Sequence, residues 1–311
     1  MSRRSLTALL LAACAALTAC QAAGTADDRG GDDRGLNAFA SLPFADYTID
    51  EAGARKIHTA GWVLARSCMD GLGFSGFTTL DPASLGDGDP LPQGGPDAVD
   101  APDVGTGDTL YGVDDPDTAA TRGYHQPPLA RGPRWVRDQY EALTGLVGEG
   151  RPRTAHGHRI PEGGCLGQAR RTIYGAPPKE YALGGLKMSD YEALTTTLTV
   201  QAFSASQKDP VRRKADRAWS RCMAEAGLRY ASPYDAASDP HWGTDRPSPR
   251  EKKTATEDAR CKRETGYVRT AHAVDVRFEK RLVAGHRAEL EHQRDRDRAA
   301  VARAAGIISH G

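Results

Sequence analysis

Two short segments of this 311-residue chain repeat each other around a cysteine, and this repeat constrains the fold more than any other feature. Each begins with Cys-Met, at Cys68 and at Cys222, and continues through three variable residues to a glycine and an apolar residue. A weaker repeat surrounds Cys165 and Cys261, which are followed three residues later by Gln and Glu. The repeats predict two units, each with a Cys-Met helix followed by a second cysteine helix.

The N-terminus has the three parts of a secretory signal. Arg3 and Arg4 carry positive charge, residues 6–17 form an uncharged apolar run, and small residues lead into Cys20. The apolar run is about a dozen residues long, whereas a membrane-spanning helix needs roughly 20. We therefore expect export of the chain and removal of residues 1–19.

Leu17-Thr18-Ala19-Cys20 resembles the bacterial lipobox. The resemblance implies a diacylglycerol on the Cys20 sulfur and cleavage before this residue. Two acyl chains hold a protein stably on a membrane, because each buried CH₂ contributes about 0.8 kcal/mol. The expected location is the outer face of the cytoplasmic membrane, and an ordinary secretory signal is the alternative. The adjacent Arg3 and Arg4 leave twin-arginine export open.

Export places the other cysteines of the mature chain in an oxidising compartment, where an even number of cysteines predicts disulfides. Four cysteines allow three pairings, and the two-unit repeat favours Cys68–Cys165 and Cys222–Cys261. A four-cysteine zinc site is the alternative, and the absence of any Cys-x-x-Cys argues against it.

Three further groups of residues carry a resemblance. They are the paired Cys-Met-x-x-x-Gly motifs, Tyr111-Gly112-Val113-Asp114-Asp115-Pro116 leading to Gly123-Tyr124-His125, and Pro161-Glu162-Gly163-Gly164-Cys165. Together they resemble actinobacterial, Streptomyces-like secreted proteins and lipoproteins for which no activity is known. The resemblance covers much of residues 50–270, and it implies an address in the cell envelope without implying any catalysis.

Helix-start signals precede apolar residues at helical spacing in four places. The signals are Thr48 with Glu51, Ser189 with Glu192, Asp209-Pro210, and the combined cap, proline and box of Ser248-Pro249-Arg250-Glu251. Convincing strand alternation is absent. The sequence therefore predicts a mainly α fold, built of disulfide-stapled helical units with long irregular loops and a long C-terminal helix.

Two helical faces can be read in more detail. The helix after Pro210 is expected to bury one apolar stripe, formed by Val211, Ala215, Ala218, Cys222 and Ala226. From Tyr267 apolar residues step by four and three, and alternating charges follow in residues 291–298. We interpret this pattern as a C-terminal helix that is packed at its start and solvated at its end, with a coiled-coil arm as the alternative.

The predicted organisation has four parts: a signal peptide at 1–19, a flexible tether at 20–43, and helical cysteine units at 44–187 and 188–311. The first unit contains an acidic Asp/Gly/Pro-rich insertion at about 77–123, interpreted as a surface loop or a disordered segment.

Few residues suggest chemistry. His156-Gly157-His158 with Glu162 is the best candidate for zinc, and it is more typical of a surface loop than of a metal site. The aspartates at Asp87-Gly88-Asp89 and at 114–117 lack the spacing of a calcium-binding EF-hand. Tyr230, Tyr234 and Trp242 are expected to anchor one loop in the core, with an aromatic ligand platform as the alternative.

Charge is balanced overall, with 41 basic and 41 acidic residues. Residues 211–311 are nevertheless basic; their interleaved acids favour a solvated surface over a face for anionic partners. We expect no cofactor and no nucleic-acid partner. The expected role is a non-enzymatic interaction or accessory module that is bound to the membrane through its lipid. An envelope protein and an anionic cell-wall polymer are its candidate partners. A zinc-dependent cell-wall hydrolase using His156 and His158, and a ligand-binding lipoprotein of a transporter, are the alternatives.

Overall fold

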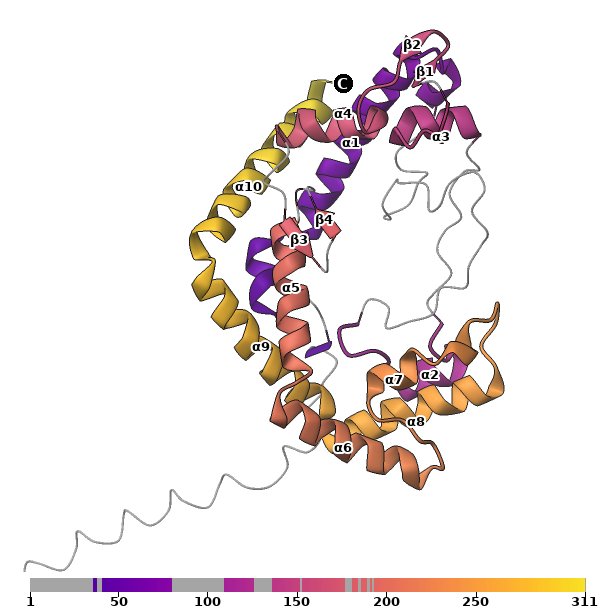
Figure 1. Ribbon diagram of the computed structural model, residues 1–311, viewed down its shortest axis with the longest axis vertical. Helices are drawn as coiled ribbons and strands as arrows, with labels where there is room; N and C mark the ends of the chain where they lie inside the picture. Colours follow the sequence, from indigo (N-terminus) through magenta and orange to yellow (C-terminus); the bar gives the residue numbers. More distant parts are fainter. Residues whose placement is uncertain are drawn as a thin grey trace, which may run out of the picture.

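A computed structural model describes residues 36–37, 41–79, 109–125, 136–151, 153–176, 181–183, 186–188, 191 and 193–310. In this part of the chain the helices lie along an arc, but not in chain order, since α2 (Pro116–Arg122) packs on α8 (Pro249–Thr265), far from α1 (Glu51–Gly71) and α3 (Arg137–Thr144) (Figure 1). The predicted mainly α fold is confirmed, with two cysteine pairs at disulfide distance and a long C-terminal helix. None of the helices in these ranges is both long enough and apolar enough to cross a membrane.

The α-helices are α1 (Glu51–Gly71), α2 (Pro116–Arg122), α3 (Arg137–Thr144), α4 (Gly164–Tyr174), α5 (Ala193–Ser206), α6 (Pro210–Glu225), α7 (Pro233–Ala237), α8 (Pro249–Thr265), α9 (Tyr267–Gly285) and α10 (Arg287–His310). The 3-10 helices of the described residues include η3 (Pro43–Tyr47), η4 (Ser75–Thr79) and η6 (Pro240–Trp242). Strands β1 (Thr154–Ala155) and β2 (His158–Arg159) form one antiparallel hairpin, and β3 (Tyr181–Leu183) and β4 (Leu186–Met188) form another.

The helix starts follow the predicted caps in two of the three places that can be compared. Asp209 caps α6 by accepting from the Val211 N–H, and Ser248 starts α8 with a complete capping box. The prediction was wrong for α1, where the cap is Asp50, because its carboxylate accepts from the Gly53 N–H. The Thr48 hydroxyl instead donates to the Ala45 carbonyl. The residues Ser189 and Glu192 lie outside the described part.

The first cysteine pair joins α1 to α4. Cys68 and Cys165 have a Cα–Cα distance of 5.6 Å, and the Trp62 ring stacks on Phe77 beside them. The start of α4 lies so close to the end of α3 that a Cβ on Gly164 would be 2.3 Å from the Leu143 carbonyl oxygen. Gly164 also has a φ of 66°, so the glycine is required here both for its conformation and for the close approach.

Helix α10 crosses the first predicted unit rather than extending into solvent. Ala300 and Ala304 are fully buried in a cluster with Ala60 of α1 and Ile173 of α4. The Arg303 guanidinium donates to the Ile173 carbonyl. The expectation of a solvated end was therefore wrong, and the contacts of α10 cross the predicted boundary between the units at residue 188. The small alanine side chains give α10 too weak an apolar pattern to be recognised.

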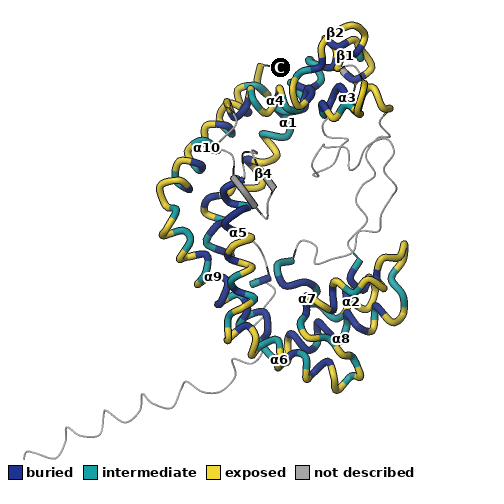
Figure 2. The backbone as a smooth tube through the Cα atoms, viewed as in Figure 1, coloured by how far each residue is buried: buried dark blue, intermediate teal, exposed yellow. Residues whose placement is uncertain are grey.

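The chain around η3 packs on α5, α9 and α10. Phe44 and Tyr47 are buried with Leu198 and Leu290, and the Phe44 N–H donates to Glu279 Oε2 at 3.0 Å. Leu36 packs further along, against the cluster of α6, α8 and α9. The described residues of the predicted tether at 20–43 are thus held against the fold. Buried positions are distributed along the whole arc (Figure 2).

The second cysteine pair joins α6 to α8, with a distance of 5.7 Å between the Cα atoms of Cys222 and Cys261. The buried face of α6 is rotated from the expected one: Trp219 is fully buried, whereas Val211 is 47% exposed. Residues 109–125, the strap, pack on this part of the molecule. Most of the strap belongs to the predicted acidic insertion at 77–123, so the described end of that insertion is an ordered segment that contains α2.

Candidate functional site

The strap is held against α8 and α9 by polar contacts along its length. Lys262 Nζ donates to the Val113 carbonyl, and Arg263 Nε donates to the Asp114 carbonyl, both at 2.9 Å. Asp115 caps α2 and pairs with Arg263. The segment from Tyr111 to Pro116, one of the motifs noted in the sequence, therefore lies against the second unit.

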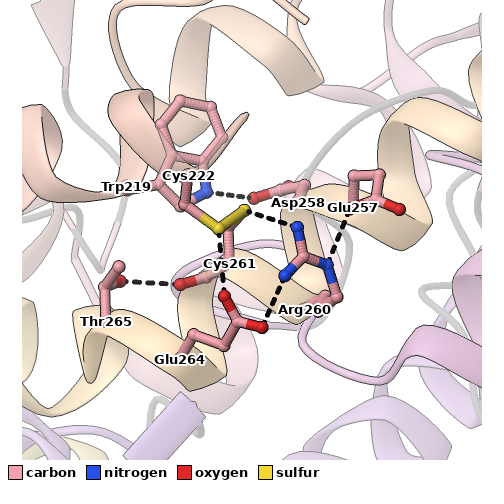
Figure 3. The surroundings of a disulfide bond; sticks show 8 residues. All are labelled: Trp219, Cys222, Glu257, Asp258, Arg260, Cys261, Glu264 and Thr265. Carbon is pink, nitrogen blue, oxygen red and sulfur yellow. Dashed lines mark hydrogen bonds and ion pairs between the residues drawn. A yellow bond between two sulfur atoms is a disulfide. The ribbon is translucent and has the colours of Figure 1, made fainter. Parts of the chain in front are cut away.

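A fully buried ion pair lies at the centre of these contacts. Asp258 Oδ2 and Lys262 Nζ are 2.9 Å apart on successive turns of α8, and both side chains are at most 1% exposed. Trp219 Nε1 donates to Asp258 Oδ1 at 2.9 Å (Figure 3), and the Tyr124 hydroxyl donates to Asp258 Oδ2. Burial raises the pKa of Asp258, although Lys262 and these two donors oppose the shift.

The disulfide of the second unit includes Cys261, which lies between the two residues of this pair and directly before Lys262. Glu264 Oε2 lies 3.3 Å from Cys222 Sγ, and the Arg260 guanidinium donates to Cys261 Sγ at 3.8 Å (Figure 3). Arg260 is itself held between Glu257 and Glu264. Cys261 is fully buried and Cys222 is 7% exposed, which favours a structural role for this disulfide.

The end of the strap is bonded to the start of α8. Glu251 is fully buried, caps its own helix, and accepts from the Tyr124 N–H at 2.9 Å. His125 places Nδ1 2.8 Å from Glu251 Oε1 and Nε2 2.6 Å from the Thr244 carbonyl. Burial lowers the pKa of His125, but these two acceptors outweigh it and the pKa is raised. Because both ring nitrogens face acceptors, the arrangement suits a doubly protonated imidazolium.

A second buried network joins the strap to α6 and α9. The Tyr111 hydroxyl donates to Asp275 Oδ2 at 2.7 Å, and Arg212 donates to Tyr267 at 3.0 Å and lies 3.4 Å from the same Asp275 oxygen. One turn further along α9, Glu279 is 3% exposed. Burial raises the pKa of Glu279 to about 7, the nearby Asp275 carboxylate adds to the shift, and the Phe44 N–H opposes it.

The raised pKa of Glu279 predicts a pH dependence of stability. The folded value of about 7 lies above the ordinary value of 4.5, so the stabilisation is complete below pH 4.5 and is lost as the pH rises to about 7. We expect the free energy of unfolding to fall by about 1 to 3 kcal/mol over this window. Glu279→Gln should remove this decrease when the free energy of unfolding is measured with urea at several pH values. Glu289→Gln, on the exposed surface, should leave the decrease in place. The same pH dependence of the free energy of unfolding in wild type and Glu279→Gln would show that Glu279 does not have a raised pKa.

Of the zinc candidates, His156 and His158 lie in the β1–β2 hairpin, and Glu162 lies between this hairpin and α4. His156 and Gly157 are the two turn residues of the hairpin, with φ angles of 46° and 83°, as a type I′ turn requires. His156 Nδ1 is 2.8 Å from the Leu72 carbonyl, while His158 and Glu162 are exposed. Within the described ranges no three His, Cys, Asp or Glu side chains gather as a metal site would require. His125, the nearest upstream histidine, is bound to Glu251 in the other cysteine unit.

The other candidates have structural contacts where they are described. Asp115 accepts from the Thr118 hydroxyl in the cap of α2, and Asp87-Gly88-Asp89 lies outside the described residues. In the aromatic loop, Trp242 is buried and donates to the Ala236 carbonyl, as expected of a core anchor. Tyr234 differs from this expectation, because it is 58% exposed.

Tyr234 forms part of an exposed apolar patch. Its ring centroid lies 6.5 Å from that of Phe203, which is 42% exposed on α5. Val200 lies one turn before Phe203 on the same helix and is 41% exposed. The patch, defined as Val200, Phe203 and Tyr234, brings together α5 and α7. It was not predicted from the sequence, because the apolar and polar residues of α5 alternate without marking one face as buried.

Sequence reasoning also missed the buried charges of α8. Glu251, Ala255, Asp258 and Lys262 follow one another at spacings of four, three and four, which places them on one helical face. The signal was present, because Ala255 and Ala259 mark this face as buried.

No family model, curated protein or solved structure matches the chain.

Proposed function

We propose that this chain is a lipid-anchored protein of the bacterial cell envelope that acts as a non-enzymatic interaction module. The location rests on the pattern Leu17-Thr18-Ala19-Cys20, and cysteine pairs at disulfide distance are consistent with an oxidising compartment. The observation that carries the interaction role is the exposed apolar patch of Val200, Phe203 and Tyr234. Exposed aromatic side chains are enriched where proteins bind each other.

The chemistry of the described interior also supports an interaction role. Asp258, Glu251 and His125 are engaged with neighbouring side chains and backbone groups. Such contacts stabilise the strap and α8. An acid or base acting on a substrate would need to reach that substrate within hydrogen-bonding distance.

Lipidation can be tested on the full chain expressed in a bacterial host. Cys20→Ser should move the protein from the membrane fraction to the soluble or secreted fraction, because the sulfur that carries the acyl chains is lost. Cys14→Ser, inside the apolar run, should leave the protein in the membrane fraction. Mass spectrometry should find a diacylglycerol on the N-terminal cysteine of wild type. An unprocessed and unmodified N-terminus in the cytosol contradicts the proposal.

The interaction role has its own test. A photoreactive amino acid at position 203 or 234 should crosslink the protein to one distinct envelope component. The same probe at Lys56, which is exposed on α1, should give no such product. Identical crosslinking patterns from all three positions would remove the support for a specific binding patch.

A further inference from the structure

We infer that the outer face of α6 is a binding surface for anionic phospholipid headgroups. This inference rests on the proposed lipid anchor, and it adds a second contact between the protein and its membrane. The basic face is defined by Arg213, Lys214, Arg217 and Arg221, all of them exposed.

The four cations share one side of α6. Arg213, Arg217 and Arg221 are separated by four residues each, and Lys214 follows Arg213, so the four lie within about 100° around the helix axis. Trp219 and Met223 point to the opposite side, where they are fully buried. The position of these buried residues fixes the basic face outward.

The acidic residues near this face are largely engaged elsewhere. Asp209 caps the helix and pairs with Arg277, and Asp216 accepts from the Tyr267 hydroxyl at 3.0 Å. Glu225, at the end of α6, is the remaining acid of this helix and is exposed. Arg213, Lys214 and Arg221 form no ion pair with any carboxylate that the structure describes. The face therefore keeps an excess of positive charge that an anionic surface would complement.

The position of the anchor relative to α6 favours a membrane over other polyanions. Leu36 packs against the cluster that contains Trp219 and Met223 of α6. Between Cys20 and Leu36 lie fifteen residues, which reach at most about 50 Å when fully extended. A lipid on Cys20 would thus keep the basic face close to the headgroups, where even a weak attraction is strengthened by the high local concentration.

The test uses the chain from position 20 with Cys20→Ser, so that neither the signal nor an acyl group contributes. Cosedimentation is measured with vesicles of phosphatidylcholine alone and with vesicles containing one-third phosphatidylglycerol. We expect binding only to the anionic vesicles, weakening as salt is raised because the attraction is screened. Arg213→Gln/Arg217→Gln/Arg221→Gln should weaken binding at least tenfold.

A matched control removes the same charge elsewhere. Lys56→Gln/Arg287→Gln/Arg298→Gln changes three exposed cations on α1 and α10, and it should alter binding less than threefold. Equal weakening by both triple variants, or no binding to anionic vesicles, would overturn the inference. Displacement of the protein from anionic vesicles by soluble poly(glycerol phosphate) at equal phosphate concentration would overturn it in favour of a cell-wall polymer. Because the assay contains no acylated protein, its outcome is independent of whether Cys20 is lipidated.

Discussion

Lys262→Met is expected to lower the free energy of unfolding by about 3 to 5 kcal/mol, because it leaves the fully buried Asp258 carboxylate without its counter-charge. Trp219 and Tyr124 would still donate to Asp258, but neither supplies a positive charge. Urea unfolding followed by circular dichroism measures the loss. Lys253→Met, on an exposed position of α8, should change the midpoint very little.

Two further measurements separate charge from packing in this variant. Adding Asp258→Asn to Lys262→Met removes the uncompensated charge and should recover part of the stability. Lowering the pH should narrow the gap between Lys262→Met and wild type, because Asp258 can then be protonated. If the difference in the free energy of unfolding from wild type is the same at every pH and in the double variant, lost packing rather than the unpaired charge causes the destabilisation.

Replacing both Cys222 and Cys261 by alanine should cost about 4 kcal/mol, because the crosslink closes a loop with a sequence separation of 39 residues. The same replacement of Cys68 and Cys165 should cost about 5 kcal/mol, since the separation there is 97 residues. Denaturant unfolding of the two double variants tests both values. Equal unfolding of wild type and the double variants without a reducing agent would contradict both values, whereas a reducing agent should abolish the difference, because it breaks the disulfides of wild type too.

The disulfide variants also test how the units depend on each other. Arg260 and Glu264 contact the sulfur atoms of the second pair, and Asp258 lies three residues before Cys261 on the same helix. Removing Cys222 and Cys261 should therefore quench or shift the fluorescence of Trp219, whose indole donates to Asp258. The variant without Cys68 and Cys165 should leave the Trp219 emission unchanged when both variants are compared in a Trp62→Phe background, because Trp62 lies beside the first pair.

The sequence predicted helix starts correctly where a side chain accepts a hydrogen bond from the backbone of its own first turn. Asp209 and Ser248 cap their helices as predicted, since a cap depends on residues within one turn. The cysteine repeats also indicated the pairing that the structure contains. Thr48 failed as a cap because Asp50, two residues later, supplies a better acceptor to the first turn of α1.

Contacts between distant segments could not be read in the same way. Arg212 is buried and Val211 is exposed on α6, because Tyr267 and Asp275 of α9 provide partners for the guanidinium. The strap resembled a loop, since Val113 and Asp114 accept hydrogen bonds from Lys262 and Arg263 through their backbone carbonyls. Such partners have no periodic signature within the strap itself.

The packing of α10 on α1 affects how the chain can reach its final state. About 200 residues separate the end of α1 from the start of α10, so a ribosome adding 5–20 residues per second needs roughly 10 to 40 s to make them. During that interval the side of α1 around Ala60 has no α10 to cover it. Chaperones that bind apolar surface on nascent chains would therefore find a binding site on α1 early in synthesis. They would lose this site when the last turns of α10 pack against α1.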